Sequence, residues 1–353
     1  MGKKHIAKEI VLGVDTHLDI HVGAVIDSSG KFLGTRSISV SSTGYLELMH
    51  WASSFGSFRR AGVEGTGTYG AALCDTLISH GITVLEVNRT DRAKRRLQGK
   101  SDPTDAENAA RAVLSGIATA IPKHHSGACE AMRIASVARR SAVKAKTQSI
   151  NQIRALLVSA PQEVREKLWR VKALDCVNAC LRMRRLGKTP HLTTLAITLK
   201  SLARRWRALS KEVILLDGEL DRLTNRYAGQ LRSRFGVGPN TAAILLSVAG
   251  DNPGRLKSEA SLAALCGVNP LPASSGKTVR HRLNRGGSRA ANNALWTIAM
   301  VRMRSDPRTL AYVKRRTSEG LTTKEIQRCL KRYIVRELYP LITGELKNLN
   351  AVS

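Results

Sequence analysis

The sequence predicts an α/β fold for the N-terminal third of the chain and an all-α fold for the rest, and two observations predict this division. Between residues 10 and 87, short apolar runs typical of strands alternate with amphipathic helical segments. After Pro122 the apolar residues follow helical spacing and the chain becomes more basic. Its 353 residues suffice for two or three domains. We expect their boundaries at 1–122, 123–228 and 229–345.

Charge is the strongest feature of the composition. Lys and Arg number 57 against 27 Asp and Glu, and the formal net charge of +30 predicts a polyanionic partner. No apolar run approaches the roughly 20 residues that span a bilayer, so we expect a soluble, cytoplasmic protein without a membrane partner. Aromatic residues make up only 4% of the chain, so phosphate contacts should dominate over base stacking. The six scattered cysteines complete no zinc-ligand pattern and are predicted to be free thiols.

The first three elements are predicted strands, at 10–14, 20–26 and 31–40, with a hairpin signal at Ser28-Ser29-Gly30. Helical and strand patterns then alternate. The predicted helices cover 42–55, 69–80 and 105–114, and the predicted strands cover 60–63 and 82–87. A meander of three strands followed by this alternation is the order of a ribonuclease H-like α/β domain, whose first and fourth strands lie side by side.

Acidic residues stand at the ends of these elements. Asp15 follows the first strand, Glu64 follows the fourth, and Asp102 and Asp105 lie one turn apart at a helix start. Pro103 suits the first helical position, which predicts Asp102 as the N-cap. In this fold the four carboxylates converge on one or two divalent metal ions, because a cation relieves their repulsion. Considered one by one, the same residues would be turn residues and a capping box with solvated acids.

Glycine-rich and basic segments flank these acids. Gly65 and Gly67 follow Glu64 and let the backbone approach a ligand or a metal-bound phosphate. A basic arm before Asp102 is placed to hold a phosphate backbone, although a solvated loop has the same composition. The candidate nucleic-acid-binding residues of the arm are Arg92, Lys94, Arg95, Arg96 and Lys100.

One apolar stripe dominates the middle of the chain. From Leu195 to Leu223, apolar residues recur at alternating spacings of four and three over about four heptads, which predicts a coiled-coil seam. The seam could pair with the helical segment 129–159 of the same chain or with another protomer. Its narrow width favours self-association.

Two loops of the C-terminal region carry further candidates. Gly236 and Gly238 form a Gly-x-Gly turn before an apolar helix at 241–249. Helix-hairpin-helix elements use such turns to offer backbone N–H groups to a DNA phosphate, and structural packing of two helices is the alternative.

The second loop contains Ser274-Ser275-Gly276, preceded by two prolines and followed by cations that could neutralise a phosphate held against a serine hydroxyl. Without this context, Ser-Ser-Gly is an ordinary loop. The basic helix predicted at 322–338 is either another nucleic-acid-facing surface or a solvated helix. The candidate phosphate-binding cations after the serines are Lys277, Arg280, Arg282, Arg285 and Arg289.

Together these motifs resemble the DEDD-type insertion-sequence transposases, a group related to pilin-gene invertases and known as bridge-RNA-guided recombinases. The resemblance spans nearly the whole chain in the right order. The acidic segments are its more specific part, and the Ser-Gly pair is specific only in their company. The matching segments are Gly13-Val14-Asp15 with His17, Glu64-Gly65-Thr66-Gly67-Thr68-Tyr69, Lys100-Ser101-Asp102-Pro103-Thr104-Asp105-Ala106, Gly236-Val237-Gly238-Pro239 and Ser275-Gly276.

The resemblance implies a RuvC-like N-terminal domain that binds one or two Mg²⁺ ions, a helical coiled-coil middle and a C-terminal transposase domain. The four acids would bind the metal, and a serine would attack a DNA phosphodiester to form a covalent phosphoserine link. It further implies a structured guide RNA that pairs with donor and target DNA, and a homo-oligomer, dimeric or tetrameric, with composite sites. A bacterial or archaeal, nucleoid-associated location follows from the same resemblance.

At two positions the comparison with the family pattern is ambiguous or shows a different residue. The pattern places the serine directly before the glycine, which selects Ser275 over Ser274. Arg285 stands where relatives often carry a lysine, which keeps the charge but changes its geometry.

Two other functions fit the same residues. A hydrolytic nuclease, such as a junction resolvase, would use only the acidic metal site, with water as the nucleophile. A non-catalytic RNA- or DNA-binding protein would keep the fold and lose nothing when Asp15 or Asp102 is changed to Asn. The serine separates the recombinase from the nuclease, because only the recombinase forms a covalent protein–DNA adduct.

Overall fold

The structure is a computed structural model that describes residues 8–87, 101–125, 127–274 and 281–351. Its contacts divide the chain into two compact units. The first unit contains Met1–Gly127 and Gly250–Arg255, and the second contains Ala128–Ala249 and Leu256–Ser353. None of the described helices is both long and apolar enough to cross a membrane.

A five-stranded sheet forms the centre of the first unit, in the order β3-β2-β1-β4-β5. Strands β1 to β3 form an antiparallel meander, and β4 and β5 run parallel to β1. The predicted pairing of the first and fourth strands is therefore confirmed. The strands are β1 (Glu9–Thr16), β2 (Ile20–Asp27), β3 (Phe32–Ser39), β4 (Ser57–Glu64) and β5 (Thr83–Val87).

Side chains of β1 alternate between two cores. Ile10, Leu12 and Val14 belong to the core shared with α1 (Ser42–Ser53) and α2 (Ala71–Ser79). Val11 belongs to the core shared with α4 (Asp102–Leu114) on the opposite face. Because successive strand residues point to opposite faces, Gly13 and Asp15 lie on the α4 face of the sheet.

Glycines let α4 lie close to the sheet. A Cβ atom at Gly13 would lie 2.0 Å from the carbonyl oxygen of Ala106 and 2.3 Å from the backbone nitrogen of Ala110. A Cβ atom at Gly62, on the neighbouring strand β4, would lie 2.6 Å from the carbonyl oxygen of Ala109. The two glycines therefore determine how near α4 comes to β1 and β4, and with it where its N-terminus lies.

The start of α4 differs from the prediction by one residue. Ser101 is the N-cap, with extended backbone at φ −141° and ψ 141°, and Asp102 is already helical. The prediction of Asp102 as the N-cap was wrong, because Pro103 occupies the second helical position, where a missing N–H costs no intrahelical bond either. Asp102 and Asp105 nevertheless lie one turn apart, as the spacing requires.

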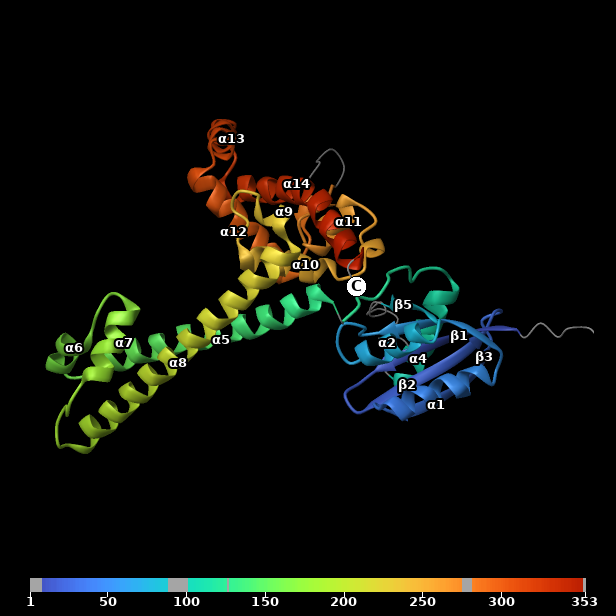
Figure 1. Cartoon of the computed structure of the whole chain (residues 1–353), viewed down its shortest axis with the longest axis horizontal. Coiled ribbons are helices and arrows are strands. Elements are labelled where there is room, and N and C mark those ends of the chain that lie inside the picture. The colour runs from blue at the N-terminus through green and yellow to red at the C-terminus, as the bar shows by residue number, and fades with distance from the viewer. Residues whose placement is uncertain (1–7, 88–100, 126, 275–280, 352–353) are drawn as a thin grey trace, which may run out of the picture. The chain divides into compact units, whose positions relative to one another are not determined.

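Two long helices, α5 (Ala128–Val158) and α8 (Pro190–Tyr227), pack along each other in the second unit, and Figure 1 shows them side by side. Lys146 of α5 lies over the ring of Trp206 of α8, 5.2 Å from its centroid, and Arg139 forms an ion pair with Asp217. The buried members of the apolar stripe are therefore covered within the chain, and self-association is not needed to bury them. These members are Leu199, Trp206, Val213, Leu220 and Leu223.

Short helices close the far end of this pair. Helices α6 (Gln162–Leu168) and α7 (Ala173–Arg182) pack with α5 and α8 around a core that includes Cys176 and Cys180. None of the six cysteines, all of which lie in the described part of the chain, forms a disulfide, as the sequence predicts. Cys329 alone among them is not buried.

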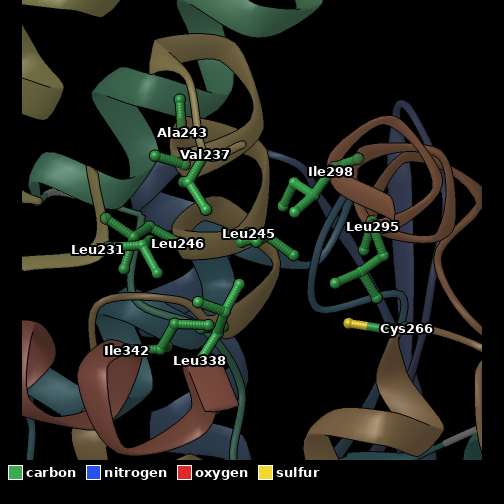
Figure 2. Close-up of a cluster of buried hydrophobic side chains, with 14 of the residues drawn as sticks. Leu231, Val237, Ala243, Leu245, Leu246, Cys266, Leu295, Ile298, Leu338 and Ile342 are labelled. Atoms are coloured by element: carbon green, nitrogen blue, oxygen red, sulfur yellow. The ribbon is translucent and has the colours of Figure 1, made fainter. Parts of the chain in front are cut away.

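The remaining helices gather around one large core, part of which Figure 2 shows. Leu231, Leu245, Leu295 and Leu338 reach this core from four different helices. The helices are α9 (Gly229–Arg232), α10 (Pro239–Ala249), α11 (Glu259–Leu265), α12 (Arg289–Ser305), α13 (Pro307–Ser318) and α14 (Thr323–Ala351). A short hairpin of β6 (Pro270–Pro272) and β7 (His281–Leu283) connects α11 to α12.

The substitution Gly13→Ala is expected to destabilise the protein by about 2 kcal/mol, because the added methyl group overlaps the backbone of α4. Thermal unfolding of the full-length chain followed by circular dichroism measures the effect. Gly67→Ala is the matched control, since nothing lies within 4 Å of a Cβ atom at that position. Equal unfolding midpoints for the two variants would contradict the close packing of α4 on β1.

Candidate metal centre

The candidate centre lies where β1 ends beside the start of α4. Asp15 is the last acidic residue of β1, and its side chain lies on the α4 face, 6% exposed. Asp102 is the first residue of α4 and is partly exposed. Since Gly13 lets α4 approach the strand, two carboxylates that are 87 positions apart in the sequence meet at one place.

His17 completes the group. Its Nε2 atom lies 3.3 Å from Oδ2 of Asp15 and 3.4 Å from Oδ1 of Asp102. One ligand atom from each of the three residues lies within 4.8 Å of the other two. The buried Nε2 atom makes no hydrogen bond of regular geometry within the described part of the chain, so its polar interactions are the two close contacts with the carboxylates.

The electrostatics of the site favour a cation. Burial raises the pKa of the Asp15 carboxyl above its ordinary value, His17 opposes that rise, and the charges of Asp105 and Asp102 add to it. A raised pKa means that the ionised form of Asp15 is held at a cost in free energy. A metal ion beside these groups would remove that cost, because it stabilises the carboxylate form.

A buried histidine orients the segment that carries His17. The backbone N–H of His17 donates to Nδ1 of His21, at 3.4 Å, and the ring of His21 stacks on Tyr45 of α1 with centroids 5.8 Å apart. Burial lowers the pKa of His21, which keeps the imidazole neutral and its Nδ1 atom able to accept this hydrogen bond. His21 therefore supports the turn after β1 from the opposite face of the sheet.

Glu64 ends β4 on the same face of the sheet as Asp15. Val14 and Val63 are register partners and share the opposite core, so the residues after them both point toward α4. The hydroxyl of Thr16 donates to the carbonyl oxygen of Glu64, at 2.8 Å, and ties the two strand ends together. Gly65 follows in the left-handed region, at φ +71°, where its missing Cβ leaves room for Thr16.

Of the four predicted metal-binding acids, Asp15 and Asp102 belong to the group of three. Asp105 is buried, 5% exposed, and lies near enough to Asp15 to raise its pKa. Among the described residues, neither Asp105 nor Glu64 supplies an atom to the 4.8 Å group. His17 joins it although it was not among the predicted ligands, and its position two residues after a strand-end aspartate was the available signal.

The donor set suits a divalent cation. Two ligands at right angles around an octahedral ion, each about 2.1 Å from it, lie about 3 Å apart. The separations of 3.3 Å and 3.4 Å around His17 Nε2 are close to that value. Carboxylate oxygens favour Mg²⁺, Ca²⁺ or Mn²⁺, whereas an imidazole nitrogen extends the choice to other divalent metals.

Many predicted nucleic-acid-binding residues lie outside the described residues, together with the predicted nucleophile. These are Arg92, Lys94, Arg95, Arg96, Lys100, Ser275, Lys277 and Arg280. In the described part, Arg282, Arg285 and Arg289 are exposed on and after β7. The adjacent Ser274 is exposed as well.

The Gly-x-Gly turn has the conformation that its sequence predicts. Gly236 has φ +82°, and α10 begins at Pro239 directly after Gly238. The N–H of Gly238 donates to the hydroxyl of Thr241, at 3.0 Å. This hydrogen bond stabilises the turn from within and leaves open whether the turn binds phosphate or only packs two helices.

Two family models match the chain. A model for the DEDD transposase of IS110 matches residues 12–160, which include Asp15, His17 and Asp102. A second model, described as Transposase IS116/IS110/IS902 family, matches residues 228–314. The chain belongs to the IS110 family of insertion-sequence transposases. As a transposase it is an enzyme that cuts and rejoins DNA, and DNA is its partner. No curated protein matches it.

Asp15→Asn or Asp102→Asn in this transposase is expected to weaken binding of Mg²⁺ or Mn²⁺ at least about tenfold, because each removes a charged oxygen ligand. Isothermal titration calorimetry of the full-length protein measures the affinity. Asp19→Asn is the matched control, since Asp19 is an exposed carboxylate four residues after Asp15. If both variants bind the ions as tightly as the control, the group of three is not a metal site.

Proposed function

We propose that this transposase is a site-specific recombinase that cuts and rejoins DNA through a serine nucleophile, Ser275, assisted by Mg²⁺. The metal-binding residues are Asp15, Glu64, Asp102 and Asp105, with His17 as a further ligand. The observation that carries the proposal is the meeting of Asp15, His17 and Asp102 within 4.8 Å, inside the region that the DEDD transposase model matches. The motif order in the sequence supports the serine.

The chemistry follows from a phosphodiester exchange. As the serine Oγ–phosphorus bond forms, the serine hydroxyl loses its proton, the bond from phosphorus to the leaving deoxyribose oxygen breaks, and that oxygen takes up a proton. One diester replaces another, so religation needs no other co-reactant. Bound Mg²⁺ would polarise a phosphoryl oxygen and offset charge in the transition state. Asp15, His17 and Asp102 would hold the ion.

Basic residues would hold the DNA backbone around this chemistry. The excess of Lys and Arg over Asp and Glu supports strong phosphate binding. We assign it to the arm before Asp102, to the cations that follow Ser275, and to the turn at Gly236 and Gly238. These groups fall in the proposed RuvC-like domain (1–122) and the proposed transposase domain (229–345), which the helical coiled-coil region (123–228) joins.

The proposed enzyme acts with a structured guide RNA and as a homo-oligomer, dimeric or tetrameric. Exposed apolar side chains on the paired helices α5 and α8 support self-association, because each would gain from burial against a partner. They are Ile134, Val137, Ile197, Ile214 and Leu215.

Protein purified with its RNA is expected to bind DNA of its own insertion element more tightly than a scrambled duplex. After ribonuclease treatment that preference should disappear, because the bases are read by the RNA. Electrophoretic mobility shifts measure both affinities, and sequencing of the co-purified RNA should find segments complementary to the element's DNA. A preference that survives ribonuclease treatment would remove the guide RNA from the proposal.

Ser275→Ala is expected to abolish the covalent protein–DNA adduct and strand transfer, because no other group takes over the attack. The measurement incubates full-length protein, RNA and element DNA with Mg²⁺ and resolves the adduct by denaturing electrophoresis. Ser274→Ala is the matched control and should retain the adduct. Cleavage by Ser275→Ala without an adduct would instead assign the enzyme to the metal-dependent hydrolytic nucleases, with water as the nucleophile.

A further inference from the structure

A cavity of 460 Å³ lies between the β6–β7 hairpin and α14 in the second unit. Its volume is within the range of small-ligand sites. Cations provide much of its lining, and most of them come from the basic helix predicted at 322–338, which the proposed function does not use. The charged and aromatic residues that matter here are Arg282, Arg328, Lys331, Arg332, Tyr333 and Arg336.

The spacing of these residues explains their convergence. Arg328, Lys331, Arg332 and Arg336 follow one another at intervals of three, one and four, which places them on one face of α14. Arg282 comes from β7 on the other side of the cavity. The cavity therefore collects positive charge from two separate elements.

Little negative charge balances this group. Arg332 donates to Oε2 of Glu259 at 2.8 Å, but Arg282, Arg328 and Arg336 form no ion pair within the described part of the chain. Glu325 also lines the cavity, and its carboxylate accepts hydrogen bonds from the backbone and hydroxyl of Thr322, at 2.8 Å and 2.6 Å. An anion in the cavity would lower the repulsion among the remaining cations.

The surroundings of Lys331 also lack negative charge. Its ammonium group donates to the neutral Oδ1 atom of Asn292, at 2.8 Å. Burial lowers the pKa of Lys331, and the neighbouring charge of Arg328 lowers it further. A phosphate beside Lys331 would reverse both influences, because it replaces lost solvation and adds an opposite charge.

The cavity also has an apolar side that suits a sugar. Leu283, Val268 and the ring of Tyr333 line it, and the Arg336 guanidinium lies 6.0 Å from the centroid of that ring. Both Leu283 and Tyr333 are about half exposed. Cations on one side and apolar surface on the other match the two parts of a nucleotide backbone.

The cavity lies beside the hairpin that carries Ser275, so a DNA strand bound in it would be the strand that the serine attacks. Pro272 of β6 pairs with His281 of β7, and the chain between them carries Ser274 and Ser275. Ser275 follows Pro270, which lines the cavity, by five residues, a chain length of at most about 18 Å. Phosphates of one strand are about 3.4 Å apart along the duplex axis, so a phosphate bound here lies within a few nucleotides of the attacked one.

We propose that this cavity binds a phosphodiester group of the DNA strand that Ser275 attacks, with the adjoining deoxyribose against Tyr333 and Leu283. The inference rests on the proposed function, since that function makes DNA the substrate of the serine. Arg328, Lys331 and Arg336 contact the phosphate. The bound strand also contacts β7, the strand that follows the serine-bearing segment in the sequence. The residues are positioning residues, because they act on the substrate beside the reacting atoms.

Cys329 provides a local reporter, since it lines the cavity and is the cysteine that is not buried. Labelling of Cys329 by N-ethylmaleimide is followed by mass spectrometry in the full-length protein with its RNA. Element DNA at tenfold its Kd should slow labelling about tenfold, because only the DNA-free fraction reacts. Arg328→Gln and Lys331→Gln should lose this protection, whereas Arg328→Lys, which keeps the charge, and Lys211→Gln on the exposed side of α8 should retain it.

The salt dependence of DNA binding gives a second readout. Arg328→Gln and Lys331→Gln each remove one cation from the phosphate, which should reduce the slope of log K against log salt by about 0.9. Labelling that DNA does not slow, or slows equally in the glutamine variants, would overturn the proposal. Protection by the RNA alone, with no further effect of DNA, would overturn it as well.

Ser275→Ala distinguishes this inference from the proposed function. The variant should lose the covalent adduct and keep the DNA protection of Cys329, because the cavity does not include the serine. An adduct that persists in Ser275→Ala would defeat the serine mechanism while the protection measurement still reports on the cavity. Loss of protection in wild-type protein would defeat the cavity while the adduct measurement still reports on the serine.

Discussion

The close approach of α4 to β1 at Gly13 is the constraint on which the metal centre depends. Any side chain at this position would overlap the backbone around Ala106 and Ala110, and the helix would have to move outward. Asp102 and Asp105 are rigidly part of that helix, so the same movement would carry them away from Asp15. Gly13, which has no side chain, therefore sets the distance between the carboxylates of Asp15 and Asp102.

The metal-centre group of the first unit and the cavity cations of the second unit share one physical feature. In each, neighbouring groups of like charge are only partly neutralised by groups of opposite charge. In the first unit, burial and neighbouring acids raise the pKa of Asp15. In the second unit, burial and a neighbouring cation lower the pKa of Lys331. Such arrangements are found at ligand-binding sites, because the ligand supplies the missing charge. Without the ligand, the folding free energy of the rest of the protein offsets the repulsion.

The spacing of apolar residues along the sequence predicted most of the helices and strands. The continuous apolar run of β1 predicts a strand buried on both faces, and the structure places its residues in two cores. The N-cap of α4 was off by one residue, because proline fits both of the first helical positions. The sequence also could not predict which helix packs against the apolar stripe of α8. A heptad repeat specifies a narrow seam but not the helix that covers it.

The candidate site was predictable to the extent that strand ends are predictable. Asp15 and Glu64 end adjacent parallel strands, and this much follows from topology. The entry of His17 into the group depends on a turn that His21 holds from the other face of the sheet, through a hydrogen bond that no sequence spacing encodes. The cavity depends on how β7 and α14, 40 residues apart, pack in three dimensions.

The division of charge between the two units has a chemical consequence. Asp15, His17 and Asp102 all belong to the first unit, whereas Arg282, Arg328 and Lys331 all belong to the second. Charges of one sign predominate in each group, and His17 only partly offsets the carboxylates of the first, since the pKa of Asp15 stays raised. A divalent cation would supply the charge that the carboxylates lack, and a phosphate would supply the charge that the cations lack. A bound ligand of opposite charge, rather than a side chain of the protein, would then complete each group.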